Sequence, residues 1–346
     1  MGKELVLVTG GSGFLGVHCI ARLLSGGYRV RATVRSHDRE ADVLAQLDRA
    51  GVVPGRSLTF ALADLMEDDG WPSAMVGVDY VLHTASPFPA VMPEDENDLI
   101  VPAKEGTLRV LRAARKAGVK RVVMTSSFAA VGYGGHFIDR PYTEDDWTHL
   151  TDDVSPYVKS KTLAERAAWE FIEREGKGLE LAVVNPVVIL GPVLGTRLST
   201  SVGVVRQFMA TKSAGVPKTH SAVVDVRDVA ELHILAMTSP EARGQRFLAV
   251  AGESMSLPQM AKVLHARLGD RAPNISTVAL ADWLVRLAAF SDPVLRDASP
   301  ELGLVKNVSA AKARTVLGWA PRSNEETLVA TAESLIELDL VGGKAA

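Results

Sequence analysis

The sequence predicts an α/β fold in which a doubly wound parallel sheet carries helices on both faces. Two observations lead to this prediction: short runs rich in β-branched residues alternate with helical patterns, and these runs are apolar almost throughout. Strands that are covered on both faces are apolar along their whole length, whereas strands with one solvated face alternate. With 346 residues, the chain is also long enough for a second, smaller unit beside the sheet.

The predicted elements alternate regularly up to about residue 190. The helical stretches show apolar residues at three- and four-residue spacing, and Gly or Pro marks several of the boundaries. The expected strands are 4–9, 28–34, 58–63, 79–85, 121–127 and 179–188, and the expected helices are 14–25, 38–50, 96–117 and 156–175.

The regular alternation ends after Gly191-Pro192. Two later segments, 223–238 and 246–252, have the pattern of a further strand and helix that return to the sheet, and the remainder is mostly helical. We therefore expect a larger unit built on the sheet and a smaller, mostly helical C-terminal lobe. The predicted units are residues 1–190 together with 220–252, and residues 191–219 together with 253–340.

The charge balance argues against a nucleic-acid partner. Lys and Arg total 38 against 41 Asp and Glu, which gives a formal net charge of −3, and neither sign forms a long run. A nucleic-acid-binding surface needs clustered basic residues. The one cysteine, Cys19, can form no internal disulfide or thiolate cluster, and the eight histidines show no metal-ligand spacing. We therefore expect no metal.

No stretch of the sequence is expected to enter a membrane. The longest apolar run, 179–190, is interrupted by Asn185 and Pro186 and is shorter than the about 20 residues that span a bilayer. The first strand begins at residue 4, which leaves no room for a signal peptide. These features predict a soluble, cytoplasmic protein that acts on a small molecule as a monomer or homodimer.

A glycine-rich loop directly follows the first predicted strand. Gly10, Gly13 and Gly16 in the stretch GGSGFLG have the spacing GxxGxxG, and the first helix is expected to begin inside it. Glycine lets the loop turn tightly and lets its backbone N–H groups approach an anion, and the helix dipole adds to that attraction. In this position of an α/β pattern, such a loop is typical of dinucleotide binding. The sequence therefore predicts that the larger unit is a Rossmann-type dinucleotide-binding domain, and the smaller lobe is then expected to bind the substrate.

The end of the second strand, in TVRSHDRE, indicates which dinucleotide binds. NAD sites usually carry an Asp or Glu here for the ribose hydroxyls, whereas NADP sites carry an Arg near the 2′-phosphate. Arg35 stands at this point and Arg39 follows, while Asp38 lies three positions late. Because a guanidinium matches a phosphate in geometry and charge, we expect NADP(H).

Tyr157 and Lys161 lie in the stretch SPYVKSKTLAE. Ser155 and Pro156 predict a helix start, so the Tyr and the Lys, four residues apart, share one helix face. In an arbitrary sequence such a pair is usually structural. Here it accompanies the glycine loop and Ser127, which ends the strand RVVMTSS at the sheet edge where ligands bind. This combination favours a functional interpretation.

Together these features resemble the extended short-chain dehydrogenase/reductase family over nearly the whole chain. Longer motifs are similar to its dihydroflavonol reductase and aldehyde/methylglyoxal reductase branch. They are HTASPF (83–88), TSSFAAV (125–131), EDDW (144–147), YVKSK (157–161), NPVVILGP (185–192), DVRDVA (225–230) and LGWAPR (317–322). Their length and order make the resemblance specific.

The resemblance implies a role for three catalytic side chains. Tyr157 would give a proton to the developing alkoxide, Lys161 would favour the phenolate and bond the nicotinamide ribose, and Ser127 would hold the carbonyl oxygen. Ser126 is the alternative to Ser127, and His83 could equally be a core histidine. The implied cofactor contacts are Gly10, Ser12, Gly13, Phe14, Leu15, Arg35, Asp64, Leu65, Thr84, Ala85, Ser86, Tyr157, Lys161, Pro186 and Val188.

The sequence indicates the substrate less directly. Plant flavonoid reductases carry an Asn five residues after the matching Ser, where this chain has Gly132, so dihydroflavonols fit poorly. Phe88 and Phe128 are candidate substrate-binding residues, or equally core residues. We expect an NADPH-dependent carbonyl reductase that converts hydrophobic aldehydes and ketones to alcohols.

Other functions compete with this prediction: a hydroxysteroid dehydrogenase, a nucleotide-sugar epimerase or dehydratase, or a non-enzymatic NADP-sensing protein. Sugar dehydratases need an Asp-Glu pair where this chain has Phe128-Ala129. Sugar epimerases usually carry an acid at the end of the second strand and an RPGD-like segment near residue 300, and neither is present. A sensor protein should lack the Tyr–Lys pair.

Overall fold

A seven-stranded parallel sheet forms the centre of the protein. The computed structural model describes residues 4–86, 95–135, 138–151, 154–210, 215–290, 295 and 299–341. The strands follow the order β10-β6-β5-β4-β1-β2-β3 across the sheet. Their bounds are Leu5–Thr9 (β1), Arg29–Val34 (β2), Leu58–Leu62 (β3), Tyr80–His83 (β4), Arg121–Thr125 (β5), Glu180–Pro186 (β6) and Arg246–Ala249 (β10). The predicted fold class is confirmed.

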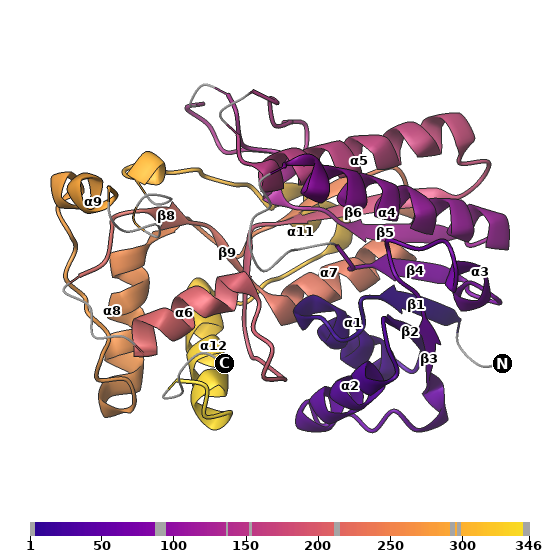
Figure 1. Ribbon diagram of the computed structural model, residues 1–346, viewed down its shortest axis with the longest axis horizontal. Coiled ribbons are helices and arrows are strands. Elements are labelled where there is room, and N and C mark those ends of the chain that lie inside the picture. The colour runs from indigo at the N-terminus through magenta and orange to yellow at the C-terminus, as the bar shows by residue number, and fades with distance from the viewer. Residues whose placement is uncertain are drawn as a thin grey trace.

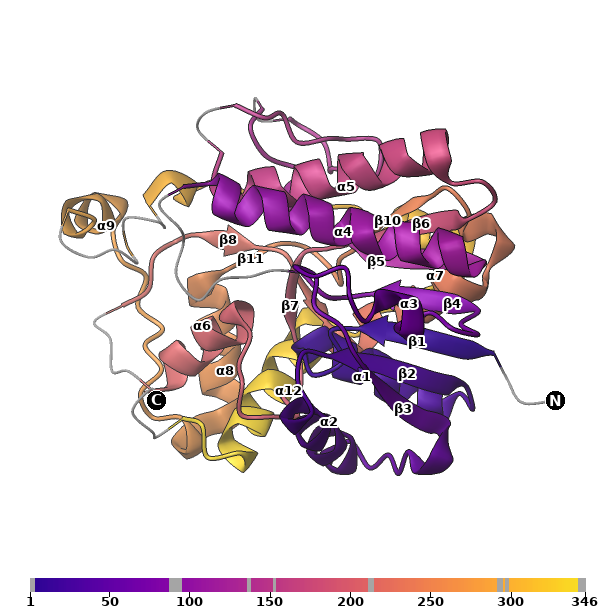
Figure 2. The ribbon, with the colours of Figure 1, turned by 45° about the vertical axis from the view of Figure 1, so that its right-hand side comes forward.

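Helices cover both faces of this sheet. Leu5 and Leu7 of β1 point into one helical layer, and Val6 points into the other, because successive side chains of a strand alternate. The first layer consists of α3 (Trp71–Ala74), α4 (Asn97–Ala117) and α5 (Pro156–Glu175), and the second of α1 (Phe14–Ser25), α2 (Asp38–Arg49), α7 (Val226–Thr238) and α11 (Ala311–Leu317). Figures 1 and 2 show α4 and α5 side by side. Across the described ranges, no helix combines the length and apolarity needed to cross a bilayer.

The predicted sixth strand is divided in two. β6 ends at Pro186, and β7 (Val188–Leu190) then pairs in parallel with β9 (Val223–Asp225), outside the main sheet. Proline has no N–H for the ladder, so the chain leaves the sheet after it. The N–H of Val188 instead donates to the Ala222 carbonyl at 3.2 Å. Of the two segments expected to return to the sheet, 246–249 does so as β10, whereas the strand at 223–225 pairs with β7.

Helices α6 (Thr200–Ala210), α8 (Leu257–Leu268) and α12 (Asn324–Glu337) pack around a separate apolar cluster. The short strands β8 (His220–Ser221) and β11 (Met255–Ser256) pair antiparallel beside it, and α9 (Asp282–Ala288) lies farthest from the sheet in Figure 1. The described 3-10 helices are Gly55–Ser57 (η1), Phe128–Ala130 (η2), Pro240–Ala242 (η3), Gly269–Arg271 (η4) and Ser299–Glu301 (η5). The division into two units stays a prediction.

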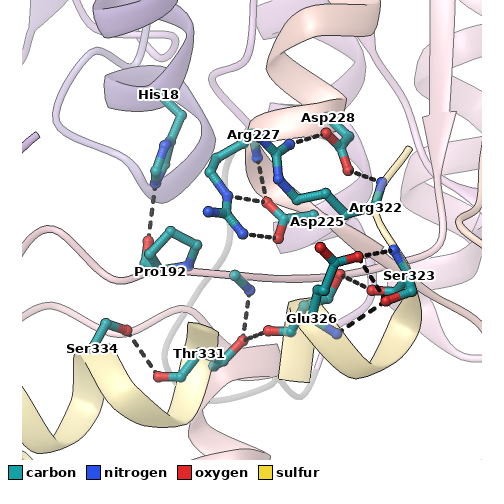
Figure 3. A network of polar contacts seen from close by, with 12 residues as sticks. His18, Pro192, Asp225, Arg227, Asp228, Arg322, Ser323, Glu326, Thr331 and Ser334 are labelled. Carbon is teal, nitrogen blue, oxygen red and sulfur yellow. Dashed lines mark hydrogen bonds and ion pairs between the residues drawn. The ribbon is translucent and has the colours of Figure 1, made fainter. Parts of the chain in front are cut away.

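Two motifs from distant parts of the chain lie together in Figure 3: DVRDVA, which begins α7, and LGWAPR, which ends just before α12. The Asp228 carboxylate accepts hydrogen bonds from the guanidinium of Arg322 and from its backbone N–H at 2.7 Å. The Asp228 carbonyl accepts another from the Trp319 indole at 2.8 Å. Asp225 caps α7 by accepting from the Arg227 N–H at 2.9 Å, and it also binds the Arg227 guanidinium. The charges at this junction are therefore paired.

A second set of contacts at the same junction holds the segment after β7 (Figure 3). The N–H of Gly191 donates to the Thr331 hydroxyl at 2.7 Å. His18 of α1 donates from Nε2 to the Pro192 carbonyl at 3.0 Å, and burial lowers the pKa of this imidazole to about 4. His18 is therefore neutral at physiological pH, and it links α1 to the start of the lobe.

Candidate active site

The predicted site residues gather at the edge of the sheet where the strands end. The glycine loop follows β1, Arg35 follows β2, Asp64 follows β3, residues 84–86 follow β4 and Ser127 follows β5. The strand order reverses at β1, because β2 and β3 lie on one side of it and β4 lies on the other. Ligands of open α/β sheets bind at such a switch point.

Hydrogen bonds tie the glycine loop to the end of β2, and they tie the loop after β4 to the end of β1. The N–H of Gly11 donates to the Thr33 carbonyl at 3.0 Å. The Thr84 hydroxyl donates to the Thr9 carbonyl at 2.6 Å, and the N–H of Ala85 donates to the Thr9 hydroxyl at 3.1 Å. The glycine loop and the loop after β4 are therefore both anchored to the ends of neighbouring strands at this edge of the sheet.

The N-terminus of α1 is shaped to receive an anion. A Cβ atom on Gly16 would lie 2.3 Å from the Gly10 carbonyl oxygen, so glycine is needed for this close approach of helix and loop. No side chain caps the helix at Gly13, and its first turn holds no acidic residue. Such an end suits the pyrophosphate of a dinucleotide. The remaining predicted residues of this loop are Ser12 and Phe14, which are partly exposed, and Leu15, which is buried.

The end of β2 leaves one predicted arginine accessible. The side chain of Arg35 is exposed and makes no ion pair or hydrogen bond with any other described residue. Arg39, in contrast, binds the Asp42 carboxylate at 3.0 Å. A hydrogen bond from the Ser36 hydroxyl lowers the pKa of the exposed Asp38 carboxyl. Arg35 is therefore available to a phosphate, as NADP binding at this position would require.

The other predicted cofactor residues lie at the ends of β3 and β6. Asp64 and Leu65 are partly exposed, and the Asp64 carbonyl accepts a hydrogen bond from the Trp71 indole at 2.9 Å, which fixes the turn. Pro186 is buried, whereas Val188 is 37% exposed. Their contacts with a cofactor stay predictions.

Helix α5 presents Tyr157 and Lys161 from its first two turns. Ser155 caps the helix, as expected, and accepts a hydrogen bond from the Val158 N–H at 3.4 Å. The Lys161 ammonium donates to the Ser86 hydroxyl at 2.9 Å, and its Nζ lies 5.8 Å from the centroid of the Tyr157 ring. The structure thus brings together three of the predicted residues, one from the loop after β4 and two from α5.

The two adjacent serines after β5 have different partners. Ser126 is buried, and its hydroxyl donates to the Glu165 carboxylate at 2.5 Å. Ser127 is partly exposed and accepts a hydrogen bond from the Ala129 N–H at 3.1 Å, which leaves its own hydroxyl proton free to donate. This difference favours Ser127 over Ser126 as the group that holds a carbonyl oxygen.

A buried carboxylate, which the sequence analysis missed, holds this serine loop against α5. Glu165 is fully buried and accepts hydrogen bonds from Ser126, from the Asn185 amide at 2.7 Å and from Arg246 Nε at 2.6 Å. The Asn185 amide also donates to the Ser127 carbonyl at 3.3 Å. The backbone beside the predicted oxygen-binding serine is therefore fixed by side chains from three elements.

The sequence did contain an indication of this network. Glu165 ends the stretch YVKSKTLAE one helical turn after Lys161, and Asn185 interrupts an otherwise apolar strand. A polar residue on a buried strand needs a hydrogen-bond partner. Pairing these two residues would have required the fold, because they lie on different elements.

His83 is a core histidine, one of the two alternatives that the sequence left open. It is buried at the end of β4, and its Nδ1 lies 2.8 Å from the Thr9 hydroxyl. Burial, with the nearby Lys161 charge, lowers the pKa of this imidazole to about 3. His83 is therefore neutral at physiological pH and is no proton donor. In the described ranges, no group of three or more His, Cys, Asp or Glu side chains could hold a metal ion.

Of the two candidate substrate-binding residues, Phe88 lies outside the described residues. Phe128 is 8% exposed, and its ring makes edge contacts with Tyr142 and Tyr133 at centroid distances of 5.4 and 5.9 Å. A Cβ atom on Gly132 would lie 2.3 Å from the Phe128 ring. The Asn found here in flavonoid reductases would therefore displace this ring. A substrate contact of Phe128 stays a prediction.

The fold and this edge of the sheet define a dinucleotide-binding α/β protein, and comparison with known sequences identifies its family. The chain belongs to the NAD dependent epimerase/dehydratase family, whose profile matches residues 6–251. The resemblance to extended short-chain dehydrogenases/reductases is thereby confirmed.

The relatives include several reductases. The putative NADPH-dependent methylglyoxal reductase GRP2 of Candida albicans is 34% identical over 263 residues, which cover 70% of this chain and 77% of that protein. Cinnamoyl-CoA reductase CAD2 of Medicago truncatula is 38% identical over 257 residues, which cover 71% of this chain and 76% of that protein.

Solved structures agree with the sequence relatives. Yeast methylglyoxal/isovaleraldehyde reductase Gre2 complexed with NADPH superimposes with a TM-score of 0.81 at 26% identity, and the match covers 98% of this chain and 100% of that one. MoeE5 in complex with UDP-glucuronic acid and NAD shares the fold, with a TM-score of 0.72 at 22% identity over 96% and 99% of the two chains.

We predict that Glu165→Gln lowers the free energy of unfolding by about 3 kcal/mol, because Arg246 then stays buried without its counter-charge. Urea denaturation measures this loss. The matched control is Glu170→Gln on the same helix, where the carboxylate is 55% exposed and pairs with Arg174 at 2.6 Å. It should change the stability by less than about 0.5 kcal/mol. Equal stability of the Glu165→Gln variant and the parent would contradict the network's role.

Proposed function

We propose that this protein is an NADPH-dependent carbonyl reductase that converts hydrophobic aldehydes and ketones to alcohols, with Tyr157 as the proton donor. The broader class is confirmed by the relatives: the protein is an NADP(H)-dependent oxidoreductase. The substrate class and the role of Tyr157 are the proposal. A cytoplasmic location and a monomeric or homodimeric state stay predictions from the sequence.

One set of contacts carries this proposal. The Lys161 ammonium donates to Ser86 at 2.9 Å while it lies beside the Tyr157 ring, so it connects the loop after β4 with the predicted proton donor. The loop after β4 is itself bonded to β1 just before the glycine loop through Thr9. An ammonium between the predicted nucleotide-binding loops and the phenol can bond the nicotinamide ribose and also favour the phenolate of Tyr157.

The side chains present can perform the proton chemistry of carbonyl reduction. Bound NADPH would supply the hydride. The Ser127 hydroxyl, whose oxygen already accepts from Ala129, would donate to the carbonyl oxygen, and this hydrogen bond strengthens as negative charge develops there. Tyr157 would give its phenolic proton to the same oxygen, and the Lys161 charge would stabilise the phenolate that remains.

The surroundings of these groups support an uncharged, apolar substrate. Tyr157 packs on a small cluster of Ala129, Val154 and Val158. Burial of apolar surface is then the main available driving force for binding. A nucleotide sugar would instead need clustered cations for its diphosphate, and the segments 127–135 and 191–203 hold a single basic residue, Arg197.

We predict that Tyr157→Phe lowers the turnover number by about 100-fold to 10,000-fold, because it removes the proton and keeps the ring. NADPH oxidation with an aryl aldehyde measures turnover, and quenching of protein fluorescence by NADPH should still report cofactor binding. Tyr80→Phe is the control, because Tyr80 begins β4 at the opposite end of the sheet, where Lys120 lies over its ring. Near-parental turnover of the Tyr157→Phe variant would show that another group is the acid.

Cofactor choice should depend on Arg35. We predict a clear parental preference for NADPH over NADH, and Arg35→Asp should reduce this preference by about tenfold to a hundredfold, because a charge-assisted hydrogen bond to the 2′-phosphate is lost. The ratio of kcat/KM for the two cofactors measures the effect. Arg56→Asp makes the same charge change at an exposed residue before β3 and should leave the ratio unchanged. Equal use of both cofactors by the parent would refute the assignment.

A further inference from the structure

A second tyrosine lies beside the predicted proton donor. Tyr133 and Tyr157 both pack against the cluster of Ala129, Val154 and Val158. The backbone of Tyr133 is fixed, because its N–H donates to the Thr148 hydroxyl at 3.1 Å and its carbonyl accepts from the His149 N–H at 3.0 Å. The side chain therefore leaves a rigid loop next to the site.

The hydroxyl of Tyr133 is available as a donor. Among the described residues, none forms a hydrogen bond with it. Burial, together with the nearby Glu301 carboxylate and Tyr157, raises the pKa of Tyr133 to about 12, so the phenol keeps its proton at neutral pH. Because this phenol is partly removed from water and has no hydrogen-bond partner among the described residues, it gains by donating to a ligand oxygen.

A lysine from the segment expected to form the C-terminal lobe lies over the ring of this tyrosine. Lys306 Nζ lies 3.7 Å from the centroid of the Tyr133 ring, an attractive cation–π geometry. The Glu301 carboxylate lies 3.2 and 3.4 Å from the same ammonium, and the Lys306 carbonyl accepts from the Ser254 hydroxyl at 2.6 Å. Because Glu301 balances the charge of Lys306, this group of side chains suits an uncharged oxygen better than a carboxylate.

We propose that the Tyr133 hydroxyl is a second substrate-binding group, which donates a hydrogen bond to an uncharged oxygen near the reacting carbonyl. The inference rests on the proposed function, because it concerns the substrate of the same site. Lys306 and Glu301 are positioning residues that hold the ring. The preferred substrates are aldehydes and ketones that carry an ether, hydroxyl or further carbonyl oxygen beside the reacting group.

A pair of ketones of equal shape tests this proposal. 2-Methoxyacetophenone and butyrophenone differ by an ether oxygen in place of a methylene, and kcat/KM is measured for both with NADPH. Tyr133→Phe keeps the ring and should lower the ratio of the two values, methoxy ketone over butyrophenone, by about threefold to tenfold. Tyr142→Phe, which removes a hydroxyl from a neighbouring ring that also contacts Phe128, should keep the parental ratio.

A double-mutant cycle separates positioning from packing. Lys306→Met removes the charge above the Tyr133 ring and should lower the ratio less than Tyr133→Phe does, with no further effect in the Tyr133→Phe background. The proposal is overturned if Tyr133→Phe changes kcat/KM for both ketones by the same factor. It is also overturned if Tyr142→Phe shifts the ratio of the two values as much as Tyr133→Phe does. If the parent reduces neither these ketones nor an aryl aldehyde, the proposed function itself fails. If the parent reduces both ketones but the Tyr133→Phe variant keeps the parental ratio of the two kcat/KM values, only the inference about Tyr133 is overturned.

Discussion

The buried carboxylate of Glu165 connects the elements on which the candidate active site depends. Its two oxygens accept from the Ser126 hydroxyl, the Asn185 amide, the Arg246 guanidinium and the Trp169 indole at 2.5 to 3.2 Å. Burying a charge costs free energy unless the charge is paired and fully hydrogen-bonded, and such a network allows few alternative arrangements of its side chains. It joins the ends of β5 and β6, and the edge strand β10, to α5. Through this network, Glu165 helps to hold the loop that carries Ser127 against the helix that carries Tyr157 and Lys161.

Local patterns account for what the sequence could predict. The glycine loop, the strand ends and the cap of α5 depend on residues close together in the chain, and the strand and helix bounds agree with the prediction to within a few residues. The Glu165 network could not be predicted in this way, because its partners Ser126 and Arg246 lie 39 and 81 positions away. For the same reason, the residues around Tyr133 in the sequence do not predict that Lys306 lies over its ring. The division of the sixth strand could be predicted in part. Pro186 marks where the ladder of hydrogen bonds must end, but β9, the new partner of β7, comes from a distant segment.

The lobe is attached to the sheet on two sides. On one side, Asp228 of α7 binds Arg322, and Thr331 of α12 binds the backbone after β7 (Figure 3). On the other, Lys306, which pairs with Glu301, lies over the ring of Tyr133 in the loop that follows Ser127. Segments from the last quarter of the chain thus contact α7, the backbone after β7 and the loop after β5. Under the proposed function, Ser127 after β5 and the Tyr157–Lys161 pair of α5 would act on the carbonyl, and Tyr133, held by Lys306, would contribute to the choice of substrate.

The central claim is that the site reduces a carbonyl with a hydride from NADPH. Its most direct test is a single-turnover reaction of stoichiometric enzyme with an aryl aldehyde and NADPH deuterated at either face of C4, followed by mass spectrometry of the alcohol. The account predicts one deuterium at the carbinol carbon from one of the two labelled cofactors, in equal amount to the cofactor oxidised. Unlabelled alcohol from both cofactors, or conversion of a UDP-sugar with no alcohol formed, would contradict it.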